Sequence, residues 1–126
     1  MSKTHEDDKV AAVARGLYAD IRGVEPACLR DAPALAGLLK EAALAAGLTA
    51  LGEPVFHRFE DAGQGVTAFL LLAESHISLH TYPEHGLLLL DVLTCGDGDP
   101  DGVLELLSSR LGGRVSAQRW DRGRIA

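Results

Sequence analysis

The residues best suited to chemistry stand together in residues 73–84, directly after the apolar run of residues 69–72. This stretch holds two serines, two histidines and two glutamates. Hydroxyl, imidazole and carboxylate groups serve as nucleophiles, acids and bases in enzymes. A strand that buries one row of side chains and ends in reactive groups holds those groups rigidly. The stretch is therefore the first candidate for an active site.

A zinc site is one possible use of the two histidines, His76 and His80. Their spacing would place both on one face of a helix. However, residues 75–81 alternate between polar and apolar and so predict a strand, on which the two rings stand about 13 Å apart. No third ligand stands out nearby, and we expect no metal.

Ser75 offers two further chemistries, which the residues alone leave open. It lies between Glu74 and His76 but lacks the G-x-S-x-G sequence of many serine hydrolases. Alternatively, its hydroxyl could attack the carbonyl before it and form an ester. Proton removal from its Cα and hydrolysis of the resulting dehydroalanine would then leave a pyruvoyl group. That route needs a base and a donor for the oxyanion.

Composition limits the class of protein. The 126 residues carry a formal net charge of −6 and show no basic patch, which argues against binding to nucleic acid. No apolar run approaches the roughly 18 residues of a membrane span. Residues 1–9 are polar, lack the core of a signal peptide and predict a loose tail. Cys28 and Cys95 stand far apart, so we expect no disulfide and a cytoplasmic location.

The elements that must position Ser75 follow from turn and cap residues. Asp31 and Asp99 are good N-caps, each followed by a proline in the first helical turn. Gly47 and residues 112–113 end the two predicted helices. Six apolar or alternating segments predict strands: residues 17–21, 48–59 (interrupted by Pro54), 66–73, 75–81, 87–93 and 115–120.

The predicted order is β-α-β-β-β-β-α-β in a single domain, residues 1–126. Short connections between neighbouring strands favour antiparallel pairing. Two helices on one face of such a sheet make a two-layer α+β sandwich. The pattern does not determine the strand order.

Several segments together resemble the small bacterial and archaeal S-adenosylmethionine decarboxylases, which are pyruvoyl-dependent. The resemblance covers roughly residues 15–124. The matching segments are Phe56-His57-Arg58-Phe59, Gly65-Val66-Thr67, Ala73-Glu74-Ser75-His76, His80-Thr81-Tyr82-Pro83-Glu84, Asp91-Val92-Leu93-Thr94-Cys95-Gly96 and Arg122-Gly123-Arg124.

The resemblance implies that the chain cuts itself between Glu74 and Ser75, with Ser75 as the precursor of a covalent pyruvoyl cofactor. Residues 1–74 would form the β chain and residues 75–126 the α chain, which stay associated. His80 would be the base in processing, and Thr67 would take the place of an assisting serine. Cys95 would return a proton to the substrate carbon after carbon dioxide leaves.

The same resemblance implies a soluble homodimer of polyamine biosynthesis that decarboxylates S-adenosylmethionine through a Schiff base. Phe59 and Tyr82 would line the substrate site, and the carboxylate of Glu84 would hold the ribose diol.

Three departures from the family pattern affect the substrate. Ala14-Arg15-Gly16 replaces a Gly-basic-His segment, His85-Gly86-Leu87 replaces Tyr-Gly-Tyr, and Tyr82 stands where tryptophan is usual. Fewer aromatic rings weaken cation–π attraction to a sulfonium. Arginine or ornithine therefore remains an alternative substrate. An unprocessed, non-catalytic homologue that regulates a true enzyme is a further alternative.

Overall fold

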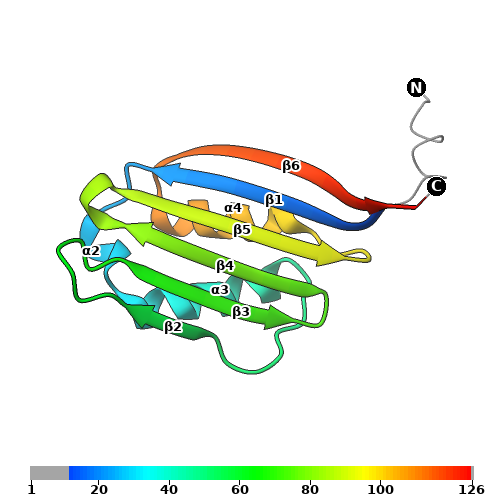
Figure 1. Cartoon of the computed structure of the whole chain (residues 1–126), viewed down its shortest axis with the longest axis horizontal. Coiled ribbons are helices and arrows are strands. Elements are labelled where there is room, and N and C mark those ends of the chain that lie inside the picture. The colour runs from blue at the N-terminus through cyan, green and yellow to red at the C-terminus, as the bar shows by residue number, and fades with distance from the viewer. Residues whose placement is uncertain (1–11, 126) are drawn as a thin grey trace.

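The computed structural model describes residues 12–125, which form one antiparallel sheet of six strands with helices on one face (Figure 1). The strands run in the spatial order β2-β3-β4-β5-β1-β6. The strands are β1 (Ala12–Arg22), β2 (Val55–Arg58), β3 (Val66–Leu72), β4 (Ser75–Tyr82), β5 (Leu87–Cys95) and β6 (Arg114–Arg124). The helices are α2 (Pro26–Leu29), α3 (Ala32–Ala45) and α4 (Pro100–Leu111), with a 3-10 turn η1 (Pro83–His85).

The two-layer α+β prediction is confirmed, and both predicted helices begin where their caps indicated. The Asp31 side chain accepts a hydrogen bond from the N–H of Ala34, at 3.2 Å. The Asp99 side chain accepts one from the N–H of Asp101, at 3.1 Å. The four-residue helix α2 was not predicted, because it is too short for apolar residues to show a helical period.

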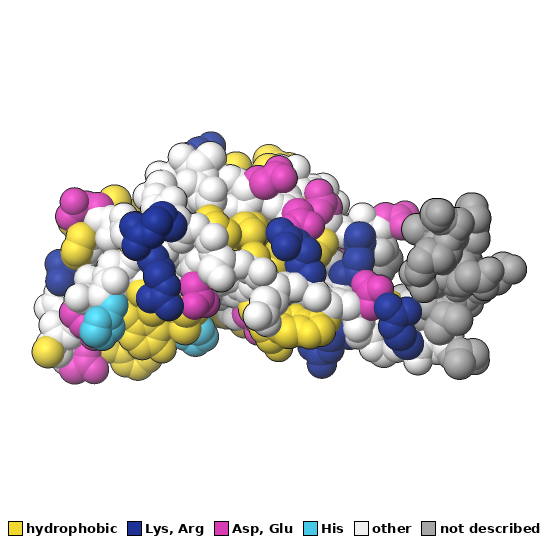
Figure 2. All heavy atoms as spheres, turned by 90° about the horizontal axis from the view of Figure 1, so that it is seen from above, with side chains coloured by type: hydrophobic (Ala, Val, Ile, Leu, Met, Phe, Trp, Pro, Cys, Tyr) yellow, Lys and Arg dark blue, Asp and Glu magenta, His cyan; other side chains and the backbone are white. Residues whose placement is uncertain are grey.

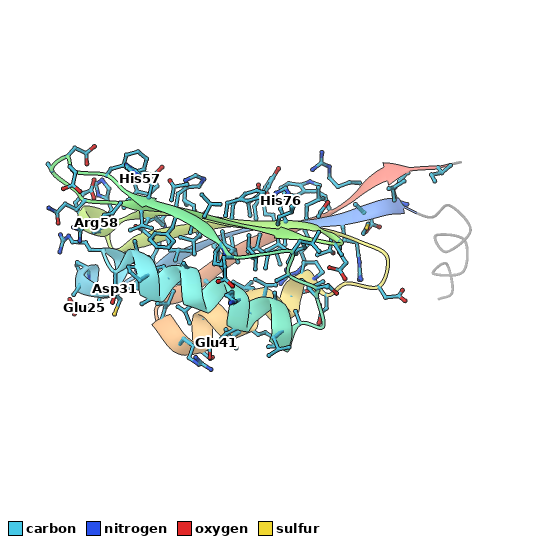
Figure 3. All side chains as sticks on the ribbon, turned by 90° about the horizontal axis from the view of Figure 1, so that it is seen from below. Glu25, Asp31, Glu41, His57, Arg58 and His76 are labelled. Carbon is cyan, nitrogen blue, oxygen red and sulfur yellow. The ribbon has the colours of Figure 1, made fainter. Side chains whose placement is uncertain are left out.

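One face of the sheet packs against α3 and α4 and forms the core (Figure 3). Strands β3, β4 and β5 alternate buried with more exposed residues, which is the period-2 pattern of a sheet with one covered face. The largest fully buried side chains are mostly leucines: Leu17, Ile21, Leu29, Leu35, Leu39, Leu70, Ile77, Leu79, Leu88 and Leu107, with Val66 and Val92. Leucine thus fills the core that the low aromatic content required.

Two strand predictions need correction. The predicted strand 48–59 is regular only over Val55–Arg58, because Pro54 and Gly52, with its φ of 83°, precede that part. In contrast, β1 and β6 each extend over 11 residues. Strands β1 and β6 pair along almost their whole length. Their pairing extends beyond the predicted strands 17–21 and 115–120. The predicted tail, residues 1–9, lies outside the described residues.

No helix formed by the described residues lies on the other face of the sheet, and we call it the open face. It carries apolar and aromatic side chains, including Tyr18 and Trp120, whose rings meet edge to face at 4.7 Å. Phe69 stacks on His76 at 5.4 Å between ring centroids, and His76 points away from the helices (Figure 3). Along the β6 edge, seen from above, basic and acidic side chains stand side by side (Figure 2).

No helix formed by residues 12–125 has the length and hydropathy needed to cross a membrane.

Candidate active site

Ser75 lies at the tip of the hairpin between β3 and β4, directly after the two-residue turn Ala73-Glu74. In the register of the hairpin it stands opposite Leu72. Its φ is 150°, a conformation that residues other than glycine rarely adopt. Such backbone conformations cost on the order of 1–3 kcal/mol and persist only where neighbouring contacts impose them. The backbone at Ser75 is therefore strained.

The contacts that impose this conformation come from segments on both sides of the hairpin tip. Thr49 accepts a hydrogen bond from the N–H of Ala73 at 2.9 Å, and its own N–H donates to the Glu74 carboxylate at 3.0 Å. On the other side, the N–H of Cys95 donates to the Glu74 carbonyl oxygen at 2.9 Å. These three bonds hold the peptide group between Glu74 and Ser75 in place.

The Thr49 N–H also lowers the pKa of Glu74 below its ordinary value, because it stabilises the ionised carboxylate. Because the pKa is lowered, the stabilisation from this contact is fully present above the ordinary carboxyl pKa. It weakens as the pH falls through the lowered value.

Thr67 and His80 form a second polar pair, on the open face. They are opposite each other in the register of β3 and β4, and Thr67 Oγ1 lies 2.9 Å from His80 Nδ1. For Nε2 of His80 to accept a proton, Nδ1 must carry a hydrogen and donate it to Thr67. The threonine can thus set both the ring orientation and the tautomer of this histidine.

A pocket of about 180 Å³ adjoins this pair. Its walls include two carboxylates and two aromatic rings, both rings being more than one-third exposed. The lining residues are Phe59, Asp61, Gly63, Gly65, Val66, Thr67, His80, Thr81, Tyr82 and Glu84. The predicted substrate residues Phe59, Tyr82 and Glu84 therefore lie together.

The turn between β2 and β3 forms one wall of this pocket and approaches Glu84 closely. A Cβ added at Gly63 would lie 2.5 Å from Glu84 Oε1, and one added at Gly65 would lie 2.4 Å from the Thr81 carbonyl oxygen. Arg30, which follows α2, donates to the Gly63 carbonyl at 3.4 Å. Glycines in this turn are thus needed so that it can close against the end of β4.

Within one chain, the two groups of predicted residues lie apart. Glu74, Ser75 and Cys95 meet at one end of β4, whereas Thr67 and His80 pair further along it. Five residues of strand separate Ser75 from His80, which corresponds to roughly 16 Å. The structure therefore brings the eight predicted residues into two clusters. The Ser75 end contains Glu74, Ser75 and Cys95; the pocket end contains Phe59, Thr67, His80, Tyr82 and Glu84.

The sequence did not point to Thr49 or Asp61. Thr49 contacts Glu74 mainly through its backbone N–H, and backbone contacts leave no mark on residue type. Asp61 lines the same pocket as Glu84, although it lies in a turn where acidic residues are ordinary. Among residues 12–125, no group of three or more His, Cys, Asp or Glu side chains is arranged to hold a metal ion.

Comparisons with known proteins identify relatives over most of the chain. Residues 15–123 match the family model described as S-adenosylmethionine decarboxylase. An S-adenosylmethionine decarboxylase proenzyme from Pyrobaculum neutrophilum is 43% identical over 102 residues, which is 79% of each chain. One from Symbiobacterium thermophilum is 42% identical over 106 residues, covering 83% of this chain and 78% of the relative.

A solved structure, the adenosylmethionine decarboxylase from Aquifex aeolicus, has the same fold. It superposes with a TM-score of 0.80 at 33% sequence identity, covering 92% of this chain and 95% of that one. Sequence and fold agree, and the chain belongs to the S-adenosylmethionine decarboxylase family.

Proposed function

We propose that this protein is a self-processing, pyruvoyl-dependent decarboxylase of S-adenosylmethionine. The observation that carries the proposal is the peptide group between Glu74 and Ser75. Its carbonyl oxygen accepts the Cys95 N–H and its serine has a strained φ of 150°. In a chain of this family, those features favour attack of the serine on its own backbone.

The cleavage follows from the groups at the hairpin tip. Ser75 Oγ attacks the Glu74 carbonyl carbon, and the Cys95 N–H stabilises the charge that develops on the oxygen. The C–N bond breaks, a C–O bond forms, and the serine proton moves to the nitrogen. A base then takes the Cα proton of Ser75, the Cβ–Oγ bond breaks, and Glu74 leaves as a new C-terminal α-carboxylate that keeps Oγ. Water replaces the nitrogen of the resulting dehydroalanine, ammonia departs, and a ketone remains at residue 75.

The base in this scheme is His80 of a second copy of the chain. Within one chain His80 is five strand residues from Ser75, about 16 Å away, too far for proton transfer. The open face carries exposed Tyr18, Phe69, Leu71 and Trp120, a surface suited to packing against another sheet. We therefore propose a homodimer in which two open faces meet.

Twofold symmetry supplies the missing geometry. A twofold axis that lies between the two sheets, at right angles to the strands, makes the strands of the two sheets run in opposite directions. The Ser75 end of one sheet then lies over the His80 end of the other. Each dimer then has two sites, each built from Ser75 and Cys95 of one chain and the pocket of the partner. Such packed sheets stand about 10 Å apart.

The pocket supports the proposed substrate. The ketone at residue 75 would supply the electrophile that takes up the substrate amine and the electron sink for decarboxylation. Phe59 and Tyr82 offer faces for a flat base and for the sulfonium, and Glu84 accepts hydrogen bonds from hydroxyls. At about 180 Å³ the pocket is smaller than the roughly 300 Å³ or more of sites for ligands of this size. This agrees with each chain providing half of the site.

The cleaved chains should remain together, because the two fragments alternate in the sheet. Residues 1–74 supply β1, β2 and β3, while residues 75–126 supply β4, β5 and β6. Strand β1 lies between β5 and β6, and β3 lies against β4. Separation would therefore break three strand ladders. Both cysteines are free thiols, as in the reducing cytoplasm that we propose for the protein.

The function is tested on the purified chain by denaturing mass spectrometry and by release of labelled carbon dioxide. We expect fragments 1–74 and 75–126, the second without an N-terminal amine. We also expect release from S-adenosylmethionine labelled in its carboxylate. An uncut chain after long incubation contradicts processing, and release from arginine or ornithine alone contradicts the substrate.

Replacement of Cys95 by alanine is expected to preserve cleavage but to lower kcat by a factor of about 10²–10⁴, the contribution of a positioned general acid. Alanine retains the backbone N–H that contacts the Glu74 carbonyl, whereas the thiol that returns the proton is lost. Fragment ratios and steady-state rates measure the two effects. Cys28→Ala is the matched control, because that thiol is exposed and belongs to neither cluster. An unchanged kcat in Cys95→Ala would remove this thiol from the proposed role.

Replacement of Gly63 by alanine is expected to raise KM about tenfold while cleavage continues, which corresponds to a weakened charge-assisted hydrogen bond. The added Cβ must displace the Glu84 carboxylate, and a flexible side chain can move without unfolding the chain. The control is Gly37→Ala, since a Cβ there meets nothing within 4 Å. Equal KM values for the two variants would show that Glu84 does not bind substrate.

A further inference from the structure

Thr94, on β5, carries a buried hydroxyl that neither the cleavage scheme nor the substrate pocket uses. Its side chain is 1% exposed, and its Oγ1 has no hydrogen-bond partner within residues 12–125. Thr81 is also buried, but its Oγ1 accepts the Val66 N–H at 2.9 Å and donates to the Leu29 carbonyl at 2.7 Å. A buried hydroxyl without a partner costs stability, because its hydrogen bonds to water are lost and not replaced. Such a group calls for a reason other than folding.

The position of Thr94 in the sheet suggests that its hydroxyl serves the cleavage reaction. In the register of β4 and β5, Thr94 stands directly opposite Ser75. Facing residues in an antiparallel pair have Cβ atoms about 4.5–5.5 Å apart, and Thr–Ser pairs at such positions form hydrogen bonds. Thr94 also immediately precedes Cys95, whose N–H holds the Glu74 carbonyl. The unpartnered hydroxyl and the peptide to be cut are thus neighbours.

The loop after β5 covers this hydroxyl. A Cβ added at Gly98 would lie 3.0 Å from Thr94 Cβ and 3.3 Å from Thr94 Oγ1, and 2.7 Å from Leu48 Cδ2. Gly98 is itself buried, so the loop packs directly over Thr94 together with Leu48. Two polar residues stand beside Thr94 in the sheet: Arg15 across the β1–β5 pair and Ser75 across the β4–β5 pair. The Arg15 guanidinium donates to the Gly98 carbonyl, whereas no bond of that kind occupies the Ser75 hydroxyl among the described residues.

We propose that Thr94 is a positioning residue for the self-cleavage reaction: its unpartnered Oγ1 accepts a hydrogen bond from Ser75 Oγ when that hydroxyl turns toward the Glu74 carbonyl carbon. This contact selects the Ser75 rotamer that faces the Glu74 carbonyl carbon. Thr94 takes up no proton, since the serine proton ends on the Ser75 nitrogen when the C–O bond forms and the C–N bond breaks. The inference rests on the proposed function, because it concerns the rate of that cleavage.

The test compares Thr94→Val with Thr94→Ser. Valine has nearly the same shape as threonine but no hydroxyl, and we expect it to slow cleavage by at least tenfold, about 1.4 kcal/mol in the barrier. Serine keeps the hydroxyl, and we expect cleavage within about threefold of the unaltered chain. The measured quantity is the rate at which freshly synthesised intact chain becomes fragments 1–74 and 75–126.

A stability measurement separates positioning from a structural role. In a Ser75→Ala background, where every chain stays intact, Thr94→Val is expected to match or exceed the Tm of its parent, because it removes an unpartnered hydroxyl. In that background Thr81→Val should lower Tm, since it removes two hydrogen bonds. A structural role for the Thr94 hydroxyl predicts the opposite, a lower Tm for Thr94→Val.

The outcomes distinguish this inference from the proposed function. Cleavage of Thr94→Val at the rate of the unaltered chain overturns the inference and leaves self-processing intact. Slow cleavage accompanied by a lower Tm, or equally slow cleavage in Thr94→Ser, also overturns it. If the unaltered chain itself is never cut, both proposals fall. Slow cleavage of Thr94→Val alone, at undiminished Tm, supports the positioning role.

Discussion

Ser75→Ala is expected to leave the chain intact indefinitely and to abolish decarboxylation. Alanine has no hydroxyl to attack the Glu74 carbonyl, so no ester, no chain break and no ketone can form. The hairpin should be otherwise unchanged, because Thr49 and Cys95 hold its tip through bonds to Ala73 and Glu74 and not to the serine side chain. Denaturing mass spectrometry of the variant should show one species of 126 residues.

The matched control for this variant is Ser78→Ala. Ser78 lies on the same strand, opposite Phe69 and Asp91, and is absent from both residue clusters. We expect it to be cut like the unaltered chain. Fragments from Ser75→Ala that end at Glu74 would mean that another nucleophile, or a protease, makes the break.

The second large effect is expected from mixing two inactive variants. His80→Ala alone should remain uncut, since no base removes the Cα proton of Ser75. Coexpressed with Ser75→Ala, however, it should be cut, because its own Ser75 then faces His80 of the partner. Random pairing places about half of the His80→Ala chains in mixed dimers, which sets the expected extent of rescue. The Ser75→Ala chain should stay intact throughout.

This experiment separates a site shared between chains from a site within one chain. A chain that carries both substitutions, Ser75→Ala and His80→Ala, is the control, since it can pair but offers no imidazole. Decarboxylation should return with the mixed dimers, at one working site in each. Absence of rescue in soluble mixed dimers would contradict the shared site.

Local residue chemistry was enough to predict much of the fold. Asp31 and Asp99 cap the two helices because a short carboxylate accepts a hydrogen bond from a free N–H of the first helical turn. The proline in each first turn is tolerated there because it needs no hydrogen-bond partner. The alternation in residues 75–81 predicted β4, and its buried Ile77 and Leu79 confirm which face packs on the helices. These features depend on near neighbours in the chain and are therefore readable from it. The long pairing of β1 with β6 was not, because it depends on segments some 100 residues apart.

The sequence by itself also determined the chemical groups of the candidate site and, through motif spacing, the family. Only the tertiary structure decided which of those groups lie at the Ser75 end of β4 and which lie at the pocket end. Spacing along a chain does not say which ends of strands meet, and the sheet placed Cys95 beside Glu74 while leaving His80 with Thr67. It also set Thr94 opposite Ser75, a relation fixed by the register of β4 and β5. Register and burial arise from packing between distant segments, which is why they appear only in the folded chain.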